Sequence, residues 1–127
     1  MRGDVLKYRT RVVSIGDQVD AFIKEQILVL FQAGAPEELA SFSVLHQPDV
    51  TDGMLEVGDT LMLGSEPYRV RAVGSVANDN LHALGHLVVK CNDRDEPELP
   101  GDVCVDAKPL VMLAVGDEIR IEGGRAS

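Results

Sequence analysis

The chain has 127 residues, of which 45% are hydrophobic and 26% charged, and its formal net charge is −9. This length suits one domain with its own hydrophobic core, and the ordinary mix of apolar and charged residues argues against disorder. The acidity, and an aromatic content of 4% with no Trp, argue against a nucleic-acid partner, because such binding needs clustered Lys and Arg or stacking rings. We therefore expect a single domain over residues 1–127, with an ordered core over about 5–122 and a loose C-terminal tail.

No apolar stretch approaches the roughly 20 residues of a membrane helix, so no direct membrane insertion is expected. The opening MRGDVLKYRTRVV lacks the apolar segment of a secretory signal. Cys91 and Cys104 are the only cysteines, and we expect free thiols because nothing indicates an oxidising compartment. These features predict a cytoplasmic protein.

The first half of the chain predicts short strands and helical turns. Residues 8–15 alternate like a half-buried strand, residues 27–31 form a continuous apolar run, and residues 42–46 form a third strand that Pro48 and Asp49 stop. Residues 18–25 predict a helical turn. Pro36 predicts another, through about Ala40, because proline suits the first helical position.

The second half continues the pattern. Strands are expected at 61–63 and 68–73, joined by a hairpin connection at 64–67, and then at 86–91, 103–105 and 119–121. A helix is expected at 77–84, ended by Gly85. Long parallel βαβ units are not expected, because the sequence does not offer the crossover helices that they need. Seven or eight strands with one or two short helices predict a mainly β fold, a small closed or nearly closed barrel, because closure removes exposed strand edges.

Three histidines, His46, His82 and His86, are the candidates for chemistry at neutral pH. A neutral imidazole nitrogen attacks phosphorus well, and the resulting P–N bond is labile enough to pass the group on. Such a carrier needs one exposed ring nitrogen and a second one held by a hydrogen bond. It also needs donors for the phosphoryl oxygens.

Sequence position leaves the role of each histidine open. His46 ends an apolar strand before a turn, which predicts either an acceptor at the barrel rim or a histidine that caps a strand end. His86 follows Gly85, which permits close approach to an anion, or it is an ordinary first residue of a strand. His82 lies mid-helix and is expected on a solvated face.

Two further patterns concern metal and phosphoryl binding. His82 and His86 are four residues apart, but Gly85 interrupts the helix and no motif completes a zinc ligand set, so no metal is expected. Gly74 and Ser75 lead into the predicted helix and offer amide and hydroxyl donors for a phosphoryl group. The same pair is also typical of an ordinary helix N-terminus.

The stretch AVGSVANDNLHALGH at residues 72–86 closely resembles the AVGxxAxxNLxxLGH segment of glucitol/sorbitol-specific IIA components. LFQAGAP at 30–36, with His46 ten residues beyond, is similar to the F-x-x-G-A-P segment that precedes the phosphorylated histidine of that family. LPG at 99–101, followed by Val103 and Val105, resembles its P-G-x-V-x-V segment. The resemblance spans about residues 8–122.

This resemblance implies a small β-barrel that relays phosphoryl groups in a phosphoenolpyruvate-dependent phosphotransferase system. HPr, charged through enzyme I, would phosphorylate His46, and the group would pass to the IIB component and then to a hexitol entering through the membrane component, IIC. His86 would line the same pocket as a hydrogen-bond partner or phosphoryl ligand. No cofactor is needed. Residues 47–52 follow no motif of the family, so an assisting residue there is not assigned.

A different class of function stays open: a β-barrel binding or regulatory module that keeps the fold and transfers nothing. Loss of either His46 or His86 would have favoured that class, and both are present. The transported sugar and the oligomeric state do not follow from any residue of the chain.

Overall fold

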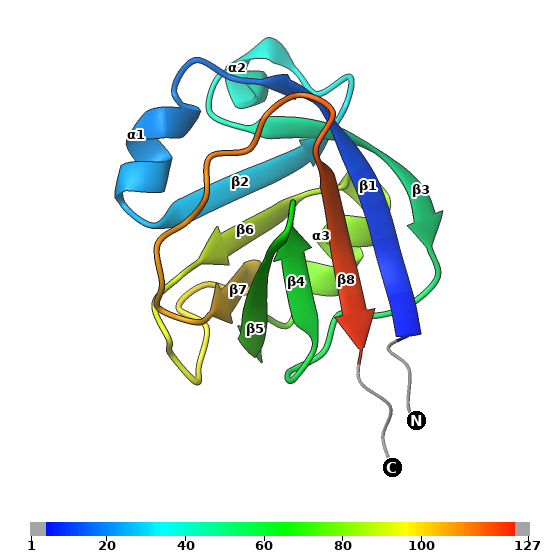
Figure 1. Cartoon of the computed structure of the whole chain (residues 1–127), viewed down its shortest axis with the longest axis vertical. Helices are drawn as coiled ribbons and strands as arrows, with labels where there is room; N and C mark the ends of the chain where they lie inside the picture. The colour runs from blue at the N-terminus through cyan, green and yellow to red at the C-terminus, as the bar shows by residue number, and fades with distance from the viewer. Residues whose placement is uncertain (1–4, 124–127) are drawn as a thin grey trace.

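The computed structural model describes residues 5–123, which form an eight-stranded closed barrel with three short helices (Figure 1). The predicted mainly β fold and barrel closure are confirmed. The elements, in chain order, are β1 (Val5–Ile15), α1 (Val19–Lys24), β2 (Ile27–Gln32), α2 (Glu37–Ala40), β3 (Val44–Thr51), β4 (Thr60–Leu63), β5 (Glu66–Val73), α3 (Ala77–Leu84), β6 (Leu87–Lys90), β7 (Asp102–Val105) and β8 (Glu118–Gly123).

Around the barrel the strands follow the order β1-β3-β2-β6-β7-β5-β4-β8, and β8 pairs again with β1. The described chain has one helix more than the one or two expected, because α1 extends over six residues. Gly123 belongs to β8, and the tail expected beyond it lies outside the described residues. No helix within residues 5–123 is long and apolar enough to span a bilayer.

The barrel interior is filled by aliphatic side chains, as the scarcity of aromatic residues requires. Along β1 the buried residues are Tyr8, Thr10 and Val12, which alternate with exposed or half-exposed ones. This period of two places every second residue of a strand on the inner face. Cys91 and Cys104 are buried and free.

Two neighbouring strand pairs are parallel, β2 with β3 and β6 with β7. Residues 33–43, which include α2, connect the first pair, and residues 91–101 connect the second. Both crossovers are short, and the first carries only the four residues of α2.

The prediction that Pro48 and Asp49 stop the third strand was wrong, because β3 continues to Thr51. Strand β2 pairs with β3 only from Val44 to His46, so the rest of β3 is free on that side. The pairing of β3 with β1 shifts register at this point, which leaves Asp49 as an extra residue. A free edge and a bulge both tolerate the missing N–H of proline.

Helix α3, predicted over 77–84, has those bounds in the structure. Its residues Ala77 and Leu81 join the hydrophobic core. The Asn78 side chain accepts a hydrogen bond from the Leu55 amide and donates one to the Leu55 carbonyl, which ties the helix to the loop before β4. Gly85 ends α3 in the left-handed conformation, with φ +61°.

Candidate functional site

His46 faces the interior of the barrel. It lies on β3 two residues after the buried Val44, and its side chain is 0% exposed. In register it sits opposite Val12 of β1 and Gln32 of β2. The position at the barrel rim expected from the sequence is therefore wrong: β3 continues past His46, and the alternation of the strand turns this side chain inward.

Both ring nitrogens of His46 have partners. Nε2 lies 2.7 Å from the Gly85 carbonyl oxygen, and Nδ1 lies 2.6 Å from the Thr10 hydroxyl. A carbonyl oxygen only accepts, so Nε2 carries the proton and donates it. In the neutral ring Nδ1 then accepts a hydrogen bond from Thr10, which engages its lone pair.

Burial also keeps the ring uncharged. Removal from water lowers the pKa of His46, and the hydrogen bond to the Gly85 carbonyl opposes this shift. Tyr8 packs edge-on against the ring, with centroids 6.4 Å apart. Its hydroxyl is buried without a partner in the described chain, and burial raises the pKa of Tyr8 to about 12.

His86 faces the opposite way. It lies directly before β6, in which Leu87 and Val89 are buried inward, so alternation directs His86 to the outer face. The antiparallel register that pairs Leu30 with Leu87 places Phe31 opposite His86. The two rings stack at 4.1 Å between centroids and 13° between planes.

One ring nitrogen of His86 is held and the other is available. Nδ1 lies 3.2 Å from the Leu30 carbonyl oxygen, so Nδ1 carries the proton and donates it. Nε2 has no hydrogen-bond partner within residues 5–123, and it is absent from the buried unpaired atoms there. It is therefore not fully buried, and its lone pair has no partner in the described chain.

Gly85 joins the two histidines. Its carbonyl accepts from His46, and its neighbour in the chain is His86. A Cβ built on Gly85 would lie 2.8 Å from Cβ of Gln32 and 3.0 Å from Cε1 of His46. Glycine is thus required here because the backbone is left-handed and because β2 and β3 approach Gly85 closely through Gln32 and His46.

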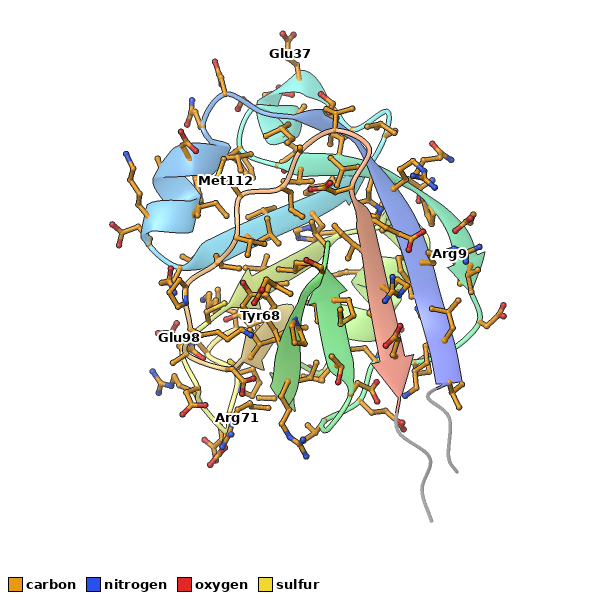
Figure 2. All side chains as sticks on the ribbon, viewed as in Figure 1. Arg9, Glu37, Tyr68, Arg71, Glu98 and Met112 are labelled. Carbon is orange, nitrogen blue, oxygen red and sulfur yellow. The ribbon has the colours of Figure 1, made fainter. Side chains whose placement is uncertain are left out.

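A shallow hollow of about 450 Å³ lies beside Phe31 and the end of α3, and His86 is not part of its lining. Phe31, on which His86 stacks, forms part of its wall. Its lining carries no charged side chain and consists of Phe31, Gln32, Ala33, Gly34, Ala35, Pro36, Leu39, Ala83 and Leu84. Glu37 on nearby α2 points away from the barrel (Figure 2). The F-x-x-G-A-P segment and the end of α3 thus meet at one surface.

The third histidine, His82, is exposed on α3 as expected. Its Nδ1 lies 2.9 Å from the Asn78 carbonyl, four residues back in the helix, and Tyr8 approaches it edge-on at 6.2 Å. No group of three or more His, Cys, Asp or Glu suited to a metal occurs in residues 5–123.

The structure does not bring Gly74 and Ser75 to the histidines. They precede the first turn of α3, whereas Gly85 and His86 follow its last turn, about 12 Å away along the axis of an eight-residue helix. The Gly74 amide is already bonded to the Asp102 carbonyl at 2.8 Å. A Cβ on Gly74 would collide with the Pro100 carbonyl, so this glycine serves the packing of the LPG segment.

Sequence reasoning missed Thr10 and the stacking role of Phe31. Thr10 is 36 residues from His46 and looks like any inward residue of an alternating strand. Phe31 belongs to the F-x-x-G-A-P segment. Its pairing with His86 depends on the register between β2 and β6, which the sequence does not show.

Comparison with known proteins decides the family. The family model described as the phosphotransferase system glucitol/sorbitol-specific IIA component matches residues 7–120. The chain belongs to this family. Membership implies a part in the phosphoryl transfer of the phosphotransferase system.

Known IIA components are similar over nearly the whole chain. The glucitol/sorbitol-specific IIA components of Shigella flexneri and Escherichia coli K12 are each 35% identical over 115 residues, 91% of this chain and 94% of theirs. The crystal structure of a phosphotransferase system IIA component from Enterococcus faecalis V583 matches with a TM-score of 0.73 and 25% identity. It covers 87% of this chain and 96% of that one.

Proposed function

We propose that the chain is a cytoplasmic phosphohistidine carrier that accepts a phosphoryl group from phospho-HPr. It then passes the group to the IIB component during uptake of a hexitol such as glucitol. Family membership supports phosphoryl transfer in general terms. The observation that carries the proposal is the pair of histidines on either side of Gly85, each with its proton position set by a backbone carbonyl.

A set tautomer matters because only the unprotonated nitrogen of a neutral imidazole has a lone pair for attack on phosphorus. A ring free to exchange tautomers would present that lone pair only part of the time. Backbone carbonyls do not titrate, so they hold the proton in place across the physiological pH range.

The assignment of His46 as acceptor, which the family resemblance implies, stays a prediction. It requires the barrel to open locally, because the Nδ1 lone pair is engaged by Thr10 and Nε2–H by Gly85. Local opening of a barrel end is within the range of native-state fluctuations. It would have to precede every transfer.

Docking of two partners in turn suits a modest, short-lived interface. The uncharged hollow beside Phe31, with Leu84 51% exposed at its wall, offers apolar contact. The net charge of −9 would attract a carrier with a basic surface, which mainly raises the rate of encounter.

The proposal is tested by incubating the wild-type chain with phosphoenolpyruvate, enzyme I and HPr, followed by intact-mass measurement at alkaline pH. The expected product carries one acid-labile phosphoryl group. Addition of the IIB component should then discharge it. A folded wild-type chain that takes no phosphoryl group would overturn the carrier function and favour the binding-module alternative.

A further inference from the structure

We propose that the hydroxyl of Tyr8 donates a hydrogen bond to a phosphoryl oxygen when His46 carries the phosphoryl group. This inference rests on the proposed carrier function with His46 as the acceptor, and it adds no covalent step to that function. It assigns Tyr8 as a further residue of the reaction, one that contacts the transferred group itself.

The first support is a hydroxyl without a partner. Tyr8 is 2% exposed and belongs to the hydrophobic core. Its hydroxyl oxygen is the one buried side-chain N or O atom within residues 5–123 that has no hydrogen-bond partner. A buried hydroxyl left unpaired lowers stability, whereas phenylalanine fills nearly the same space without that cost. The hydroxyl therefore has no stabilising role in the unphosphorylated chain.

The second support is position. Tyr8 and Val12 both face inward along β1, and Val12 lies opposite His46 on β3. The Tyr8 ring meets the His46 ring edge-on, with centroids 6.4 Å apart and planes at 67°. A phosphoryl group bonded to the edge of the His46 ring enters the space around that ring, which Tyr8 partly encloses. Tyr8 also meets His82 of α3 edge-on at 6.2 Å, so it lies on the side of His46 that faces this helix.

The third support is the protonation state of the phenol. Burial raises the pKa of Tyr8 to about 12, so its hydroxyl keeps the proton at neutral pH and can donate it. The phosphoryl oxygens carry negative charge and only accept. A hydrogen bond to a charged acceptor is roughly twice as strong as one between neutral groups, and a buried environment strengthens it further.

Donors for a phosphoryl group are scarce around His46. Burial and the Gly85 carbonyl are the only causes of its shifted pKa within residues 5–123, which indicates that no Lys or Arg of that part lies close to the ring. The phosphoryl group therefore depends on neutral donors. The Thr10 hydroxyl is bonded to His46 Nδ1, whereas the Tyr8 hydroxyl is unengaged before the group arrives.

Phosphorylation would thus supply the partner that the Tyr8 hydroxyl lacks. A hydrogen bond made in only one of two states shifts the equilibrium toward that state. The hydroxyl should therefore favour the phosphorylated carrier over the phosphorylated donor. Since hydrogen bonds to charged groups are the stronger kind, its removal should lower the equilibrium constant for transfer from phospho-HPr roughly tenfold.

Tyr68, the second of the two tyrosines in the chain, is the matched control. It is 0% exposed, and its hydroxyl donates to the Pro109 carbonyl at 2.8 Å and accepts from the Val111 amide at 3.1 Å. The change from tyrosine to phenylalanine removes two hydrogen bonds at Tyr68 and none at Tyr8. The same substitution therefore separates a structural hydroxyl from one that acts on the phosphoryl group.

The experiment compares wild type, Tyr8→Phe and Tyr68→Phe. Each chain is mixed with a fixed amount of purified phospho-HPr, and intact mass gives the ratio of the two phosphorylated proteins at equilibrium. Urea unfolding of the unphosphorylated chains gives their stability. We expect Tyr8→Phe to be at least as stable as wild type with a roughly tenfold lower equilibrium constant. Tyr68→Phe should be less stable with an unchanged constant. An unchanged constant in Tyr8→Phe overturns the inference.

A second measurement on wild type does not depend on whether a variant folds. The chain is labelled with ¹³C at the ring carbon that bears the tyrosine hydroxyl, so Tyr8 and Tyr68 give one NMR signal each. On phosphorylation the Tyr8 signal should shift and the Tyr68 signal should not. A Tyr8 signal that stays in place in the fully phosphorylated chain overturns the inference.

The two levels of the argument fail in different ways. A wild-type chain that takes no phosphoryl group from phospho-HPr overturns the carrier function itself. A phosphorylated chain in which ring-nitrogen NMR places the group on a histidine other than His46 overturns the role of Tyr8 and leaves the carrier function standing.

Discussion

Two histidines on opposite faces of one sheet differ in burial and in hydrogen bonding. The inward ring of His46 is buried and bonded at both nitrogens, and the outward ring of His86 is bonded at one and free at the other. Two aromatic neighbours follow the same division: Tyr8 meets His46 edge-on inside, and Phe31 stacks on His86 outside.

The difference teaches that a motif histidine is not by itself an exposed nucleophile. A fully bonded, buried imidazole contributes rigidity, because removal of either partner leaves a buried polar group unsatisfied. A half-bonded imidazole at the surface keeps one ring nitrogen without a hydrogen-bond partner in the described chain. Five substitution or pH experiments would break or sharpen this comparison.

The largest effect is expected for His46→Ala. The substitution leaves a cavity, and both the Thr10 hydroxyl and the Gly85 carbonyl lose their hydrogen-bond partner. The free energy of unfolding should therefore fall by about 3 kcal/mol or more. Urea unfolding measures it. His86→Ala is the matched control, with an expected loss of about 1 kcal/mol or less. Equal losses would mean that the inner and outer environments do not differ as described.

Gly85→Ala should cost about 2–3 kcal/mol, because the left-handed backbone disfavours a Cβ and the added carbon meets Gln32 and His46. Gly64→Ala is the control. Gly64 has a similar φ of +64° and nothing within 4 Å of an added Cβ. The difference between the two substitutions in thermal unfolding isolates the contact with the histidine. No difference would show that this contact is unimportant.

Acid should lower the free energy of unfolding through His46. Burial lowers the pKa of His46, so below about pH 6.5 the unfolded chain binds a proton that the folded chain does not. Stability linked to this group is full above that pH and decreases as the pH falls toward the folded-state pKa, by at most about 1.4 kcal/mol per pH unit. Unfolding at about pH 7.5 and about pH 5.5, in wild type and His46→Gln, measures it. Identical acid sensitivity in the two would refute the linkage.

Thr10→Val should lower stability by about 1–2 kcal/mol, since it removes the donor to His46 Nδ1 at nearly constant shape. Thr10→Ser keeps the hydroxyl and should recover most of that difference. Chemical denaturation of the pair separates the hydrogen bond from the packing. If serine is no better than valine, the hydrogen bond contributes little.

The smallest effect is expected for Phe31→Leu, which removes the stacking surface of His86 and keeps an apolar side chain. A loss of about 0.5–1.5 kcal/mol is expected. Chemical denaturation of the variant and the wild type measures it. A stability equal to that of the wild type would show that the stacking of His86 on Phe31 contributes little.

The sequence by itself determined the local elements and the family. Helix 77–84 and its end at Gly85 followed from helical spacing and a glycine stop, and the family segments predicted a small barrel. Strand β3 ran past Pro48 because pairing partners, which are distant in sequence, decide where proline is tolerated.

Only the tertiary structure decided which histidine lies inside. The sequence around Val44, Leu45 and His46 does not show which face of the strand meets the core. A period of two fits either orientation until the register with β1 and β2 is set. The same long-range pairing brings Thr10 to His46 and Phe31 to His86. Contacts of this kind join residues separated by dozens of positions, so they arise only when the barrel closes.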